Sequence, residues 1–292
     1  MPAKLAENLG YFKDEGLDVE LLNEPSGVDA EDEMLAGAVQ GVVGFYDHCV
    51  DLQAKGKFVE SVVQFSQAPG EVELVSQKYP DVKSMADLTG KNLGVTGLGS
   101  STNFLTQYLM TKSGIKLGEF TSVPVGAGDT FIAAMQQDKI QAGMTTEPTI
   151  SRLIATGQAR PLIDMRTIDK TKAALGGTYP AASLYMQTSW VEKNKPIVQK
   201  LANAFVKTLR YINTHDAADI TDKMPKDYYA GNKDMYVKAL ADGKGMFTSD
   251  GVMPQGGPET VLAVLSGFSR SLQGKQVDLA KTYTTEFVKN VK

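Results

Sequence analysis

The sequence predicts an α/β protein with two similar halves. Short apolar runs alternate with helical patterns along the chain, as expected for sheets of largely parallel strands covered by helices. A loop rich in glycine and hydroxyl groups, residues 97–102, lies between one such run and a helical pattern. The third observation is an imperfect repeat, in which Gly27, Met34 and Gln40 recur 101 residues later as Gly128, Met135 and Gln141. Two lobes that direct helix N-termini toward a shared crevice account for these features, although any two α/β units resemble each other in this way.

The chain is long enough for two domains, because its 292 residues are 42% hydrophobic and each half can bury a core. Its formal net charge is −4, and its lysines and arginines form no run or basic helix face, so we expect no nucleic-acid partner. A single cysteine, Cys49, excludes an internal disulfide framework. No apolar run reaches the ~18 residues that span a bilayer, and the N-terminus lacks the features of a signal peptide. We therefore expect either a cytosolic protein or one whose export signal was removed before Met1.

The first part of the chain is predicted to alternate helices and strands. Residues 3–11 form a helical pattern with Leu5, Leu9 and Phe12 on one face. A second, short helix is expected at 30–35, after a turn that contains Pro25 and Gly27. The predicted strands are residues 18–22, 41–45, 58–64 and 71–77.

The alternation continues through the middle of the chain and then gives way to helices. Strands are predicted at 92–96, 140–144, 161–165 and 182–186, and helices at 101–112, 131–136 and 149–156. Apolar residues recur every four positions from Ile197 to Leu209, which predicts a helix of nearly twenty residues with Pro196 in its first turn. Shorter helices are expected at 261–272 and 279–288.

The glycine-serine loop has the chemistry of an anion site. The first N–H groups of a helix have no partner within the helix, and the helix dipole places its positive end there. Hydroxyl groups of Ser100, Ser101 and Thr102 add further hydrogen-bond donors, so the expected ligand is an anion or a carboxylate-like group. The alternative is that Ser100 or Ser101 only caps the helix.

The sequence offers little catalytic chemistry. It contains two histidines; His215 follows the long helix, and His48 stands between Asp47 and Cys49 just past a predicted strand. Neighbours in a strand point to opposite faces, so a Cys–His pair is not expected. There is no H-x-x-x-H or C-x-x-C spacing, no G-x-S-x-G elbow, no P-loop lysine, and Asn103 stands near the last glycine position of a G-x-G-x-x-G fingerprint. We therefore predict a binding protein that is not an enzyme, with no metal and no cofactor.

Several separated motifs resemble one family. Residues 9–19 are similar to its opening signature, residues 85–95 to the run before its ligand loop, and residues 99–102 to that loop. Further similar stretches are 146–148, 178–181 and 246–251, so that the resemblance covers nearly the whole chain. The family comprises the solute-binding proteins of bacterial ABC importers, in the branch for nitrate, sulfonates, taurine and thiamine-pyrimidine precursors.

The resemblance implies a periplasmic-binding-protein-like type II fold, with two lobes and a hinge of two crossing strands. Lobe I is expected to comprise residues 1–81 and 180–292, and lobe II residues 82–179. The crossings are placed near 79–83 and 178–182. Family members usually have a strand before the opening helix, so we expect a segment upstream of Met1 that carries it and an export signal.

The resemblance also implies which residues line the cleft between the lobes. Lobe I is expected to contribute Ser26, Gly27, Tyr46, Asp47, Phe65 and Ser66. Lobe II is expected to contribute Gly99, Ser100, Ser101, Thr102, Gly128, Glu147 and Tyr179. For the aromatic residues the alternative is ordinary core packing, and for Asp47 it is a helix cap or a hydrogen bond at the hinge.

The function implied by the resemblance is that of an extracytoplasmic solute-binding protein, periplasmic or lipid-anchored. It would capture a small organic anion of the sulfonate, taurine or nitrate-like kind, or a carboxylate, and deliver it as a monomer to the permease and ATPase of an ABC importer. The first alternative is a pyrimidine binder in which Asp47 or Glu147 accepts hydrogen bonds from ring amino groups. Two more are a ligand-sensing module of a regulator and a pyrimidine-precursor synthesis enzyme of the same fold. That enzyme requires a cysteine-rich iron site, which one cysteine cannot supply.

Overall fold

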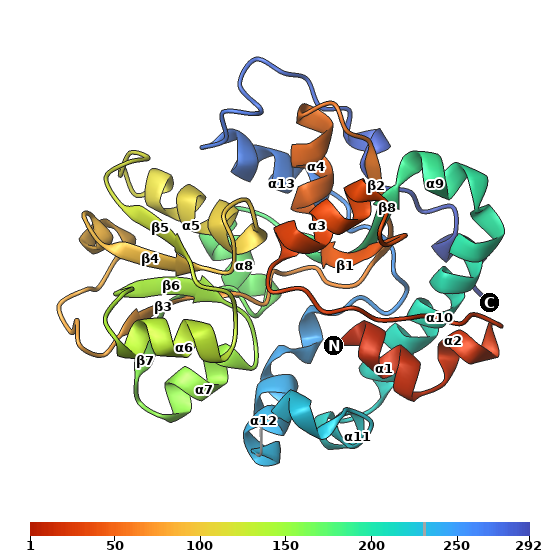
Figure 1. Ribbon diagram of the computed structural model, residues 1–292, viewed down its shortest axis with the longest axis horizontal. Helices are drawn as coiled ribbons and strands as arrows, with labels where there is room; N and C mark the ends of the chain where they lie inside the picture. Colours follow the sequence, from red (N-terminus) through yellow and green to blue (C-terminus); the bar gives the residue numbers. More distant parts are fainter. Residues whose placement is uncertain (230–231) are drawn as a thin grey trace.

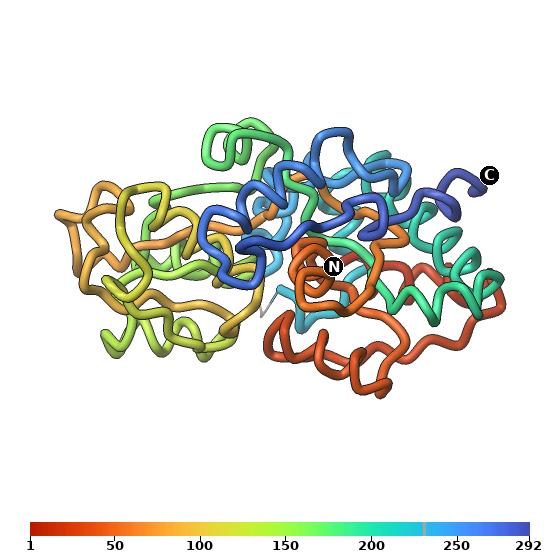
Figure 2. The backbone as a smooth tube through the Cα atoms, turned by 90° about the horizontal axis from the view of Figure 1, so that it is seen from above, coloured from red at the N-terminus to blue at the C-terminus, as the bar shows by residue number. Residues whose placement is uncertain are grey.

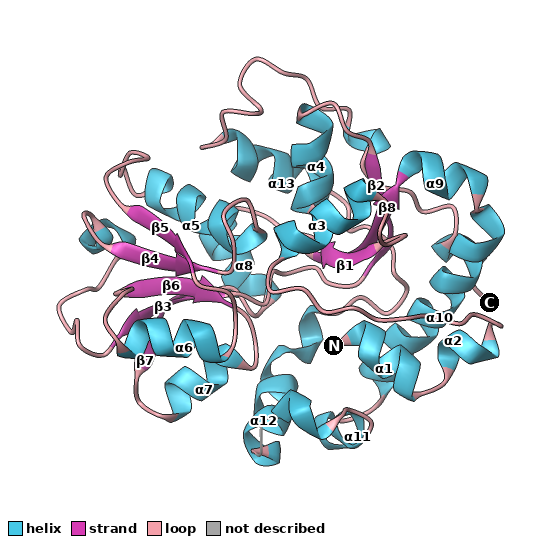
Figure 3. Ribbon diagram, in the orientation of Figure 1, coloured by secondary structure: helices cyan, strands magenta, loops and turns pink. Residues whose placement is uncertain are grey.

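Two β-sheets, each with its own helices, lie side by side in the computed structural model, which describes residues 1–229 and 232–292 (Figure 1). The smaller sheet has the order β1-β8-β2, and the larger has the order β5-β4-β6-β3-β7. The strands of the smaller sheet are β1 (Val42–Phe45), β2 (Val59–Gln64) and β8 (Ala182–Gln187). Those of the larger are β3 (Val72–Ser76), β4 (Asn92–Val95), β5 (Thr121–Pro124), β6 (Ala142–Thr145) and β7 (Ala159–Asp164). Figure 3 shows the two groups of strands as separate layers among the helices.

The strand pairing differs from the largely parallel sheets predicted from sequence. β4 is parallel to both β5 and β6, whereas β3 is antiparallel to β6 and β7, and β8 is antiparallel to β1 and β2. A parallel pair needs a crossover, usually a helix, between its strands. β3 instead arrives directly from β2 in the other sheet, so it enters its own sheet in the opposite direction.

Helices cover both sheets. Those of the smaller sheet are α1 (Pro2–Asn8), α2 (Tyr11–Asp14), α3 (Gly27–Ala36), α4 (Asp47–Ala54), α9 (Thr188–Lys193) and α10 (Lys195–Thr214). Those of the larger sheet are α5 (Ser101–Lys112), α6 (Asp129–Gln136), α7 (Thr149–Ala155) and α8 (Ile168–Leu175). The C-terminal part adds α11 (Ala217–Asp222), α12 (Lys233–Gly243) and α13 (Gly257–Ser266). α13 packs against α4 of one lobe and α5 of the other, and from above the C-terminal segment crosses the junction between them (Figure 2).

The long helix predicted from the four-residue spacing is confirmed as α10, which has 20 residues. It packs on the smaller sheet through Phe205, whose ring centroid lies 5.3 Å from that of Phe12 and 4.8 Å from that of Phe65. The imperfect repeat also corresponds to equivalent units. In one lobe α3 leads to β1, and in the other α6 leads to β6 at almost the same offset.

Three local predictions were wrong. Residues 18–22 form no ladder with another strand in the described part of the chain, because an alternating pattern alone does not supply a partner. Residues 279–288 contain no α-helix; only the 3₁₀ turns Leu279–Lys281 and Val288–Asn290 form there. His48 and Cys49 do lie just past β1, but they are in α4, which begins at Asp47, so the strand geometry assumed for this pair does not apply.

The chain passes between the sheets twice. Residues 65–71 connect β2 to β3, so the first passage precedes the predicted crossing at 79–83, which β3 already places within the larger sheet. Residues 176–181 connect α8 to β8, near the predicted second crossing. The two links lie side by side, because the N–H of Ala181 donates to the carbonyl of Ser66 at 3.2 Å. We propose that they form the hinge, which moves the first lobe boundary from residue 81 to 65–71.

Candidate ligand-binding site

The end of the larger sheet at which β4 and β6 finish faces the junction between the two lobes. The strand register brings the C-terminal ends of β4 and β6 to the same edge as the start of β3, since Val72 is paired with both Thr145 and Asp164. The loops that leave this edge therefore include 96–101, 146–148 and the link before β3. The sequence-predicted glycine-serine loop is one of them.

The glycine-serine loop is held by its own polar groups. Gly99 has φ +91°, a conformation that favours glycine, and its N–H donates to Oδ1 of Asn103 at 3.1 Å. Oγ1 of Thr102 accepts the N–H of Thr96 at 3.0 Å. Ser100 occupies the N-cap position of α5, but its hydroxyl makes no cap bond; it accepts the N–H of Val28 at 3.3 Å, from the other lobe. The loop thus serves as a contact between the lobes as well as a helix start.

Asp47 is the centre of the polar contacts between the lobes. Its side chain is fully buried at the start of α4, and its Oδ2 accepts the hydroxyl of Ser101 at 2.6 Å and that of Tyr179 at 2.9 Å. Ser101 belongs to the first turn of α5, and Tyr179 to the second link. Oδ1 of Asp47 has no hydrogen-bond partner among the described residues. Burial raises the pKa of this carboxyl, although His48 and the two hydroxyls lower it in part.

Two further carboxyl groups are buried where the first link enters β3. Glu71 is the last residue of the link and Glu73 is the second residue of β3; they are 2% and 0% exposed. Burial, the charge of Asp47 and that of Glu73 raise the pKa of Glu71 well above its usual range. Burial raises the pKa of Glu73 to about 8, despite a hydrogen bond from the hydroxyl of Thr106 at 2.9 Å. Sequence reasoning missed both residues, although two glutamates at alternate positions of an apolar strand were a usable signal.

Small residues let the lobes approach. A Cβ added to Gly97 would lie 2.7 Å from Oγ of Ser26, across the junction. Ser26 caps α3, accepting the N–H of Asp29 at 3.3 Å and donating its hydroxyl to Asp29 Oδ2 at 2.6 Å. A Cβ on Gly27 would lie 3.2 Å from Nε2 of His48. Ser26 therefore lies at the junction on the side of the smaller sheet, whereas Gly27 contacts His48 of its own lobe.

His48 is buried in a polar pair of its own. Its Nδ1 bonds Oε2 of Glu31, and its ring stacks on that of Tyr185 at a centroid distance of 6.0 Å. Burial lowers the pKa of His48, but the bond to Glu31 and the charge of Asp47 outweigh it and raise the pKa overall. Burial raises the pKa of the Cys49 thiol well above its usual value, which disfavours a reactive thiolate.

The other predicted site residues have three different roles. Tyr46 and Phe65 are core residues: the Tyr46 hydroxyl bonds Thr282, and Phe65 packs on α10. Ser66 stabilises the two links, because its hydroxyl donates to the carbonyl of Ala68 and accepts the N–H of Ala182. Gly128, at φ +68°, donates its N–H to Oγ1 of Thr149 at 2.9 Å. The structure thus brings Asp47, Ser101 and Tyr179 into direct contact and leaves the two aromatic residues in the core.

Glu147 lies at the same edge but is engaged with an arginine that sequence reasoning did not single out. Its Oε1 pairs with Arg166 at 3.2 Å, and its Oε2 accepts the N–H of Ser151 at 3.0 Å. The guanidinium of Arg166 also donates two hydrogen bonds to Asp164, and its backbone N–H donates a third. Burial raises the pKa of Asp164, but the hydrogen bonds from Arg166 and Lys170 have the larger combined effect and lower the pKa to about 2. The positive charge of Arg166 is therefore shared between two carboxylates.

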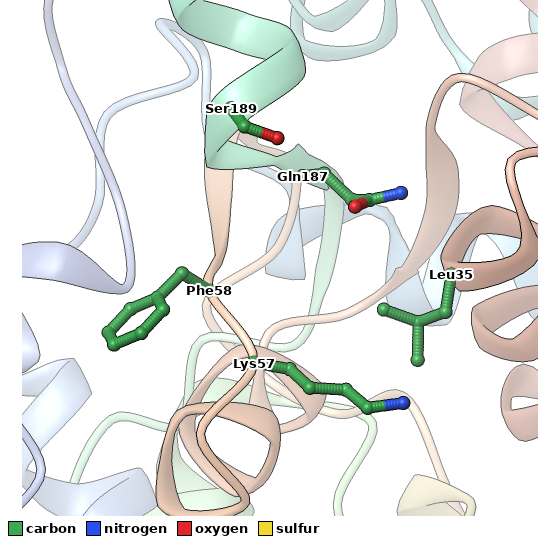
Figure 4. Close-up of a pocket in the computed structure, with 5 residues that line it drawn as sticks. All are labelled: Leu35, Lys57, Phe58, Gln187 and Ser189. Atoms are coloured by element: carbon green, nitrogen blue, oxygen red, sulfur yellow. The ribbon is translucent and has the colours of Figure 1, made fainter.

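A hollow elsewhere on the surface has a volume of about 350 Å³. Leu35, Lys57, Phe58, Gln187 and Ser189 line it, at the ends of β2 and β8 (Figure 4). It contains none of the residues described above. Within residues 1–229 and 232–292, no group of three or more His, Cys, Asp or Glu side chains is arranged to hold a metal ion, and no helix is long and apolar enough to cross a bilayer.

A family model described as NMT1/THI5 like matches residues 1–218, more than half of the chain. The chain belongs to the NMT1/THI5-like family. A curated relative in Saccharomyces cerevisiae, the 4-amino-5-hydroxymethyl-2-methylpyrimidine phosphate synthase THI11, is 27% identical over 219 residues. The match covers 73% of this chain and 63% of the yeast enzyme, so this NMT1/THI5-like chain spans less than two thirds of that relative's length.

Solved structures extend the likeness to the whole fold. A protein of Bordetella bronchiseptica RB50 is 34% identical with a TM-score of 0.95, over 99% of this chain and 91% of that one. The alkanesulfonate-binding protein SsuA of Xanthomonas axonopodis pv. citri, bound to MOPS, is 18% identical with a TM-score of 0.79, over 97% and 94% of the two chains. The predicted family and the predicted type II binding-protein fold are thereby confirmed.

Proposed function

We propose that this protein is the extracytoplasmic ligand-binding component of an ABC importer, which closes its lobes around a small molecule and presents it to a permease and its ATPase. The observation that carries the proposal is the buried contact of Asp47 with Ser101 and Tyr179. These side chains come from the first lobe, the second lobe and the hinge. A ligand that contacts these three side chains touches both lobes and the hinge. Such a ligand binds the closed arrangement more tightly than the open one and so favours closure. We expect the protein to act as a monomer, periplasmic or lipid-anchored.

The ligand class is a choice between an organic anion and a molecule with amino groups. The first turn of α5 was expected to receive the anion, but the carboxylate of Asp47 already accepts the Ser101 hydroxyl there. A ligand with N–H donors, such as an aminopyrimidine, instead finds an acceptor in Asp47. The geometry therefore supports the aminopyrimidine alternative over the anion, and the synthase activity of the yeast relatives concerns the same kind of ring.

The competing proposal is a synthase, as the names of the curated relatives indicate. That chemistry would require reactive groups in the junction. The thiol of Cys49 is buried in α4, and His48 is bonded to Glu31. We therefore propose binding without turnover.

The test is to bind and recover the ligand. Purified protein is incubated with a fractionated metabolite extract, and retained compounds are identified by mass spectrometry after gel filtration. We expect one compound to be retained unchanged and to raise the melting temperature. Asp47→Asn should lose it, whereas Asp32→Asn, an exposed position on α3, should retain it. Conversion of the compound on incubation would replace the binding proposal with the synthase, and retention by Asp47→Asn would place the site elsewhere.

A further inference from the structure

We propose that a second hollow, between α4, α5 and residues 268–271, binds a small aromatic carboxylate, and that this occupant favours the closed arrangement of the lobes. We name it the α4–α5 hollow. Its volume is about 260 Å³, and its lining includes neither Asp47 nor the glycine-serine loop. The site itself is independent of the proposed function, whereas its effect on closure rests on that function.

Both lobes supply walls of the α4–α5 hollow. Asp51 of α4 lies on one side, and on the other lie Phe104 of α5 and Leu117, which follows that helix. Residues 268–271, which come after α13, complete the lining. The hydroxyl of Ser271 donates to Oδ1 of Asp51 at 2.7 Å, so this segment is attached to α4. An occupant would therefore contact α4 and its attached segment together with α5 of the other lobe.

The apolar part of the lining suits an aromatic ring. The ring centroids of Phe104 and Phe268 are 6.0 Å apart, and the angle between the ring planes is 37°. Both side chains are 7% exposed and line the hollow, and Leu117 is 39% exposed. A flat ring placed here would remove apolar surface of Leu117 from water and pack against the phenylalanines in the offset or edge-to-face geometries that aromatic pairs prefer.

The charged part of the lining favours an anion. It contains the cationic side chains of Lys55 and Arg270 and one carboxylate, that of Asp51. The carboxylate already has partners, because Nζ of Lys55 lies 2.5 Å from its Oδ2 and the hydroxyl of Ser271 donates to its Oδ1. Arg270 is exposed, and in the described part of the chain its guanidinium forms no ion pair. A guanidinium binds a carboxylate through two parallel hydrogen bonds, which selects this group over a neutral amide.

The effect on closure follows from the position of the hollow between the lobes. Separation of α4 from α5 would pull its two walls apart, so the site is complete only when the lobes are closed. A ligand that binds one arrangement more tightly than the other shifts the population toward it. An aromatic carboxylate in the α4–α5 hollow and a compound at Asp47 should therefore each raise the affinity for the other.

The test uses three probes of nearly equal size that differ in charge: benzoate, benzamide and benzamidinium. Each is titrated at pH 7 into isotope-labelled protein, with NMR amide shifts to locate the site and calorimetry to measure affinity. We expect benzoate to bind at least tenfold more tightly than the other two, and to shift the signals of Leu117 and residues 268–271 rather than those of the glycine-serine loop. Arg270→Gln should remove this preference, whereas Arg210→Gln, exposed on α10 outside the hollow, should keep it.

Two further measurements separate the α4–α5 hollow from the site at Asp47. Asp47→Asn should bind benzoate as tightly as the wild type, and benzoate alone should reduce the radius of gyration of the wild type in small-angle X-ray scattering. Equal binding of benzamide or benzamidinium, no response to benzoate, a preference that survives Arg270→Gln, or loss of benzoate binding in Asp47→Asn would each overturn the second site. Binding of benzoate in the hollow with an unchanged radius would overturn its effect on closure.

The proposed function fails in a different way. If benzoate binds and reduces the radius as expected, but no compound is recovered from the metabolite extract, the second site stands and the importer role falls. If a compound is recovered and closes the lobes while benzoate does not bind, the importer role stands and the second site falls.

Discussion

The buried carboxyl of Glu73 should make the free energy of unfolding depend on pH, because burial raises its pKa. The side chain is fully buried on β3, and its pKa lies at about 8 against an ordinary value of 4.5. The carboxyl is neutral in the folded protein but ionised in the unfolded chain at neutral pH. Because the folded pKa is the higher one, its contribution to stability is complete below pH 4.5 and is lost as the pH rises toward 8. The loss is about 1.4 kcal/mol per pH unit, or about 3 kcal/mol at pH 7.

Glu73→Gln removes the titration and keeps the shape of the side chain. The amide oxygen can still accept the Thr106 hydroxyl, so the variant should gain stability over the wild type as the pH rises. We expect urea unfolding between pH 5 and 8 to show a difference in free energy of unfolding that grows by about 4 kcal/mol in total. Glu33→Gln, on the surface of α3, should follow the wild type throughout. Parallel curves for Glu73→Gln and the wild type would refute the assignment of a neutral buried carboxyl.

Three other substitutions test the junction and the core. Gly97→Ala places a methyl group 2.7 Å from Oγ of Ser26, so it should hold the lobes apart and increase the radius of gyration in X-ray scattering, whereas Gly243→Ala, with open space around it, should not. Ser101→Ala removes a hydrogen bond to a buried carboxylate and should weaken closure by about 1.5–3 kcal/mol; calorimetry with the recovered ligand should show a 10- to 100-fold loss of affinity, and an unchanged affinity would contradict this. Phe205→Ala leaves a cavity beneath α10 and should lower the free energy of unfolding by about 3–5 kcal/mol in urea; a loss below 1 kcal/mol would show that this contact is not part of the core.

Local patterns in the sequence were sufficient for most of the fold. The spacing of apolar residues located α10 because such a helix buries one continuous stripe, and the glycine-serine motif located the start of α5. Strand direction was not accessible in this way. The antiparallel pairing of β3 depends on its entry from another sheet, and the absence of a ladder at residues 18–22 depends on what lies beside them.

The site was predicted in part, and the reasons lie in tertiary contacts. Asp47, Ser101 and Tyr179 were all expected near the ligand, yet their bond to one another came only from the fold. These hydrogen bonds change the ligand that the site is expected to bind, because the carboxylate of Asp47, an acceptor, lies at the start of α5, where only donors were expected. Glu71 and Glu73 were missed because a strand pattern does not show that a charged side chain is buried on both faces of the sheet.

The most direct test of the proposed function is the radius of gyration of the protein with and without the compound recovered from the extract. Small-angle X-ray scattering should show a smaller radius for the saturated wild type than for the stripped protein. Asp47→Ala should keep the larger radius at the same concentration, because the residue that joins both lobes and the hinge has lost its acceptor. A compound that binds the wild type tightly without reducing its radius, or that closes Asp47→Ala equally well, would contradict the claim that this protein works by closing on a ligand at Asp47.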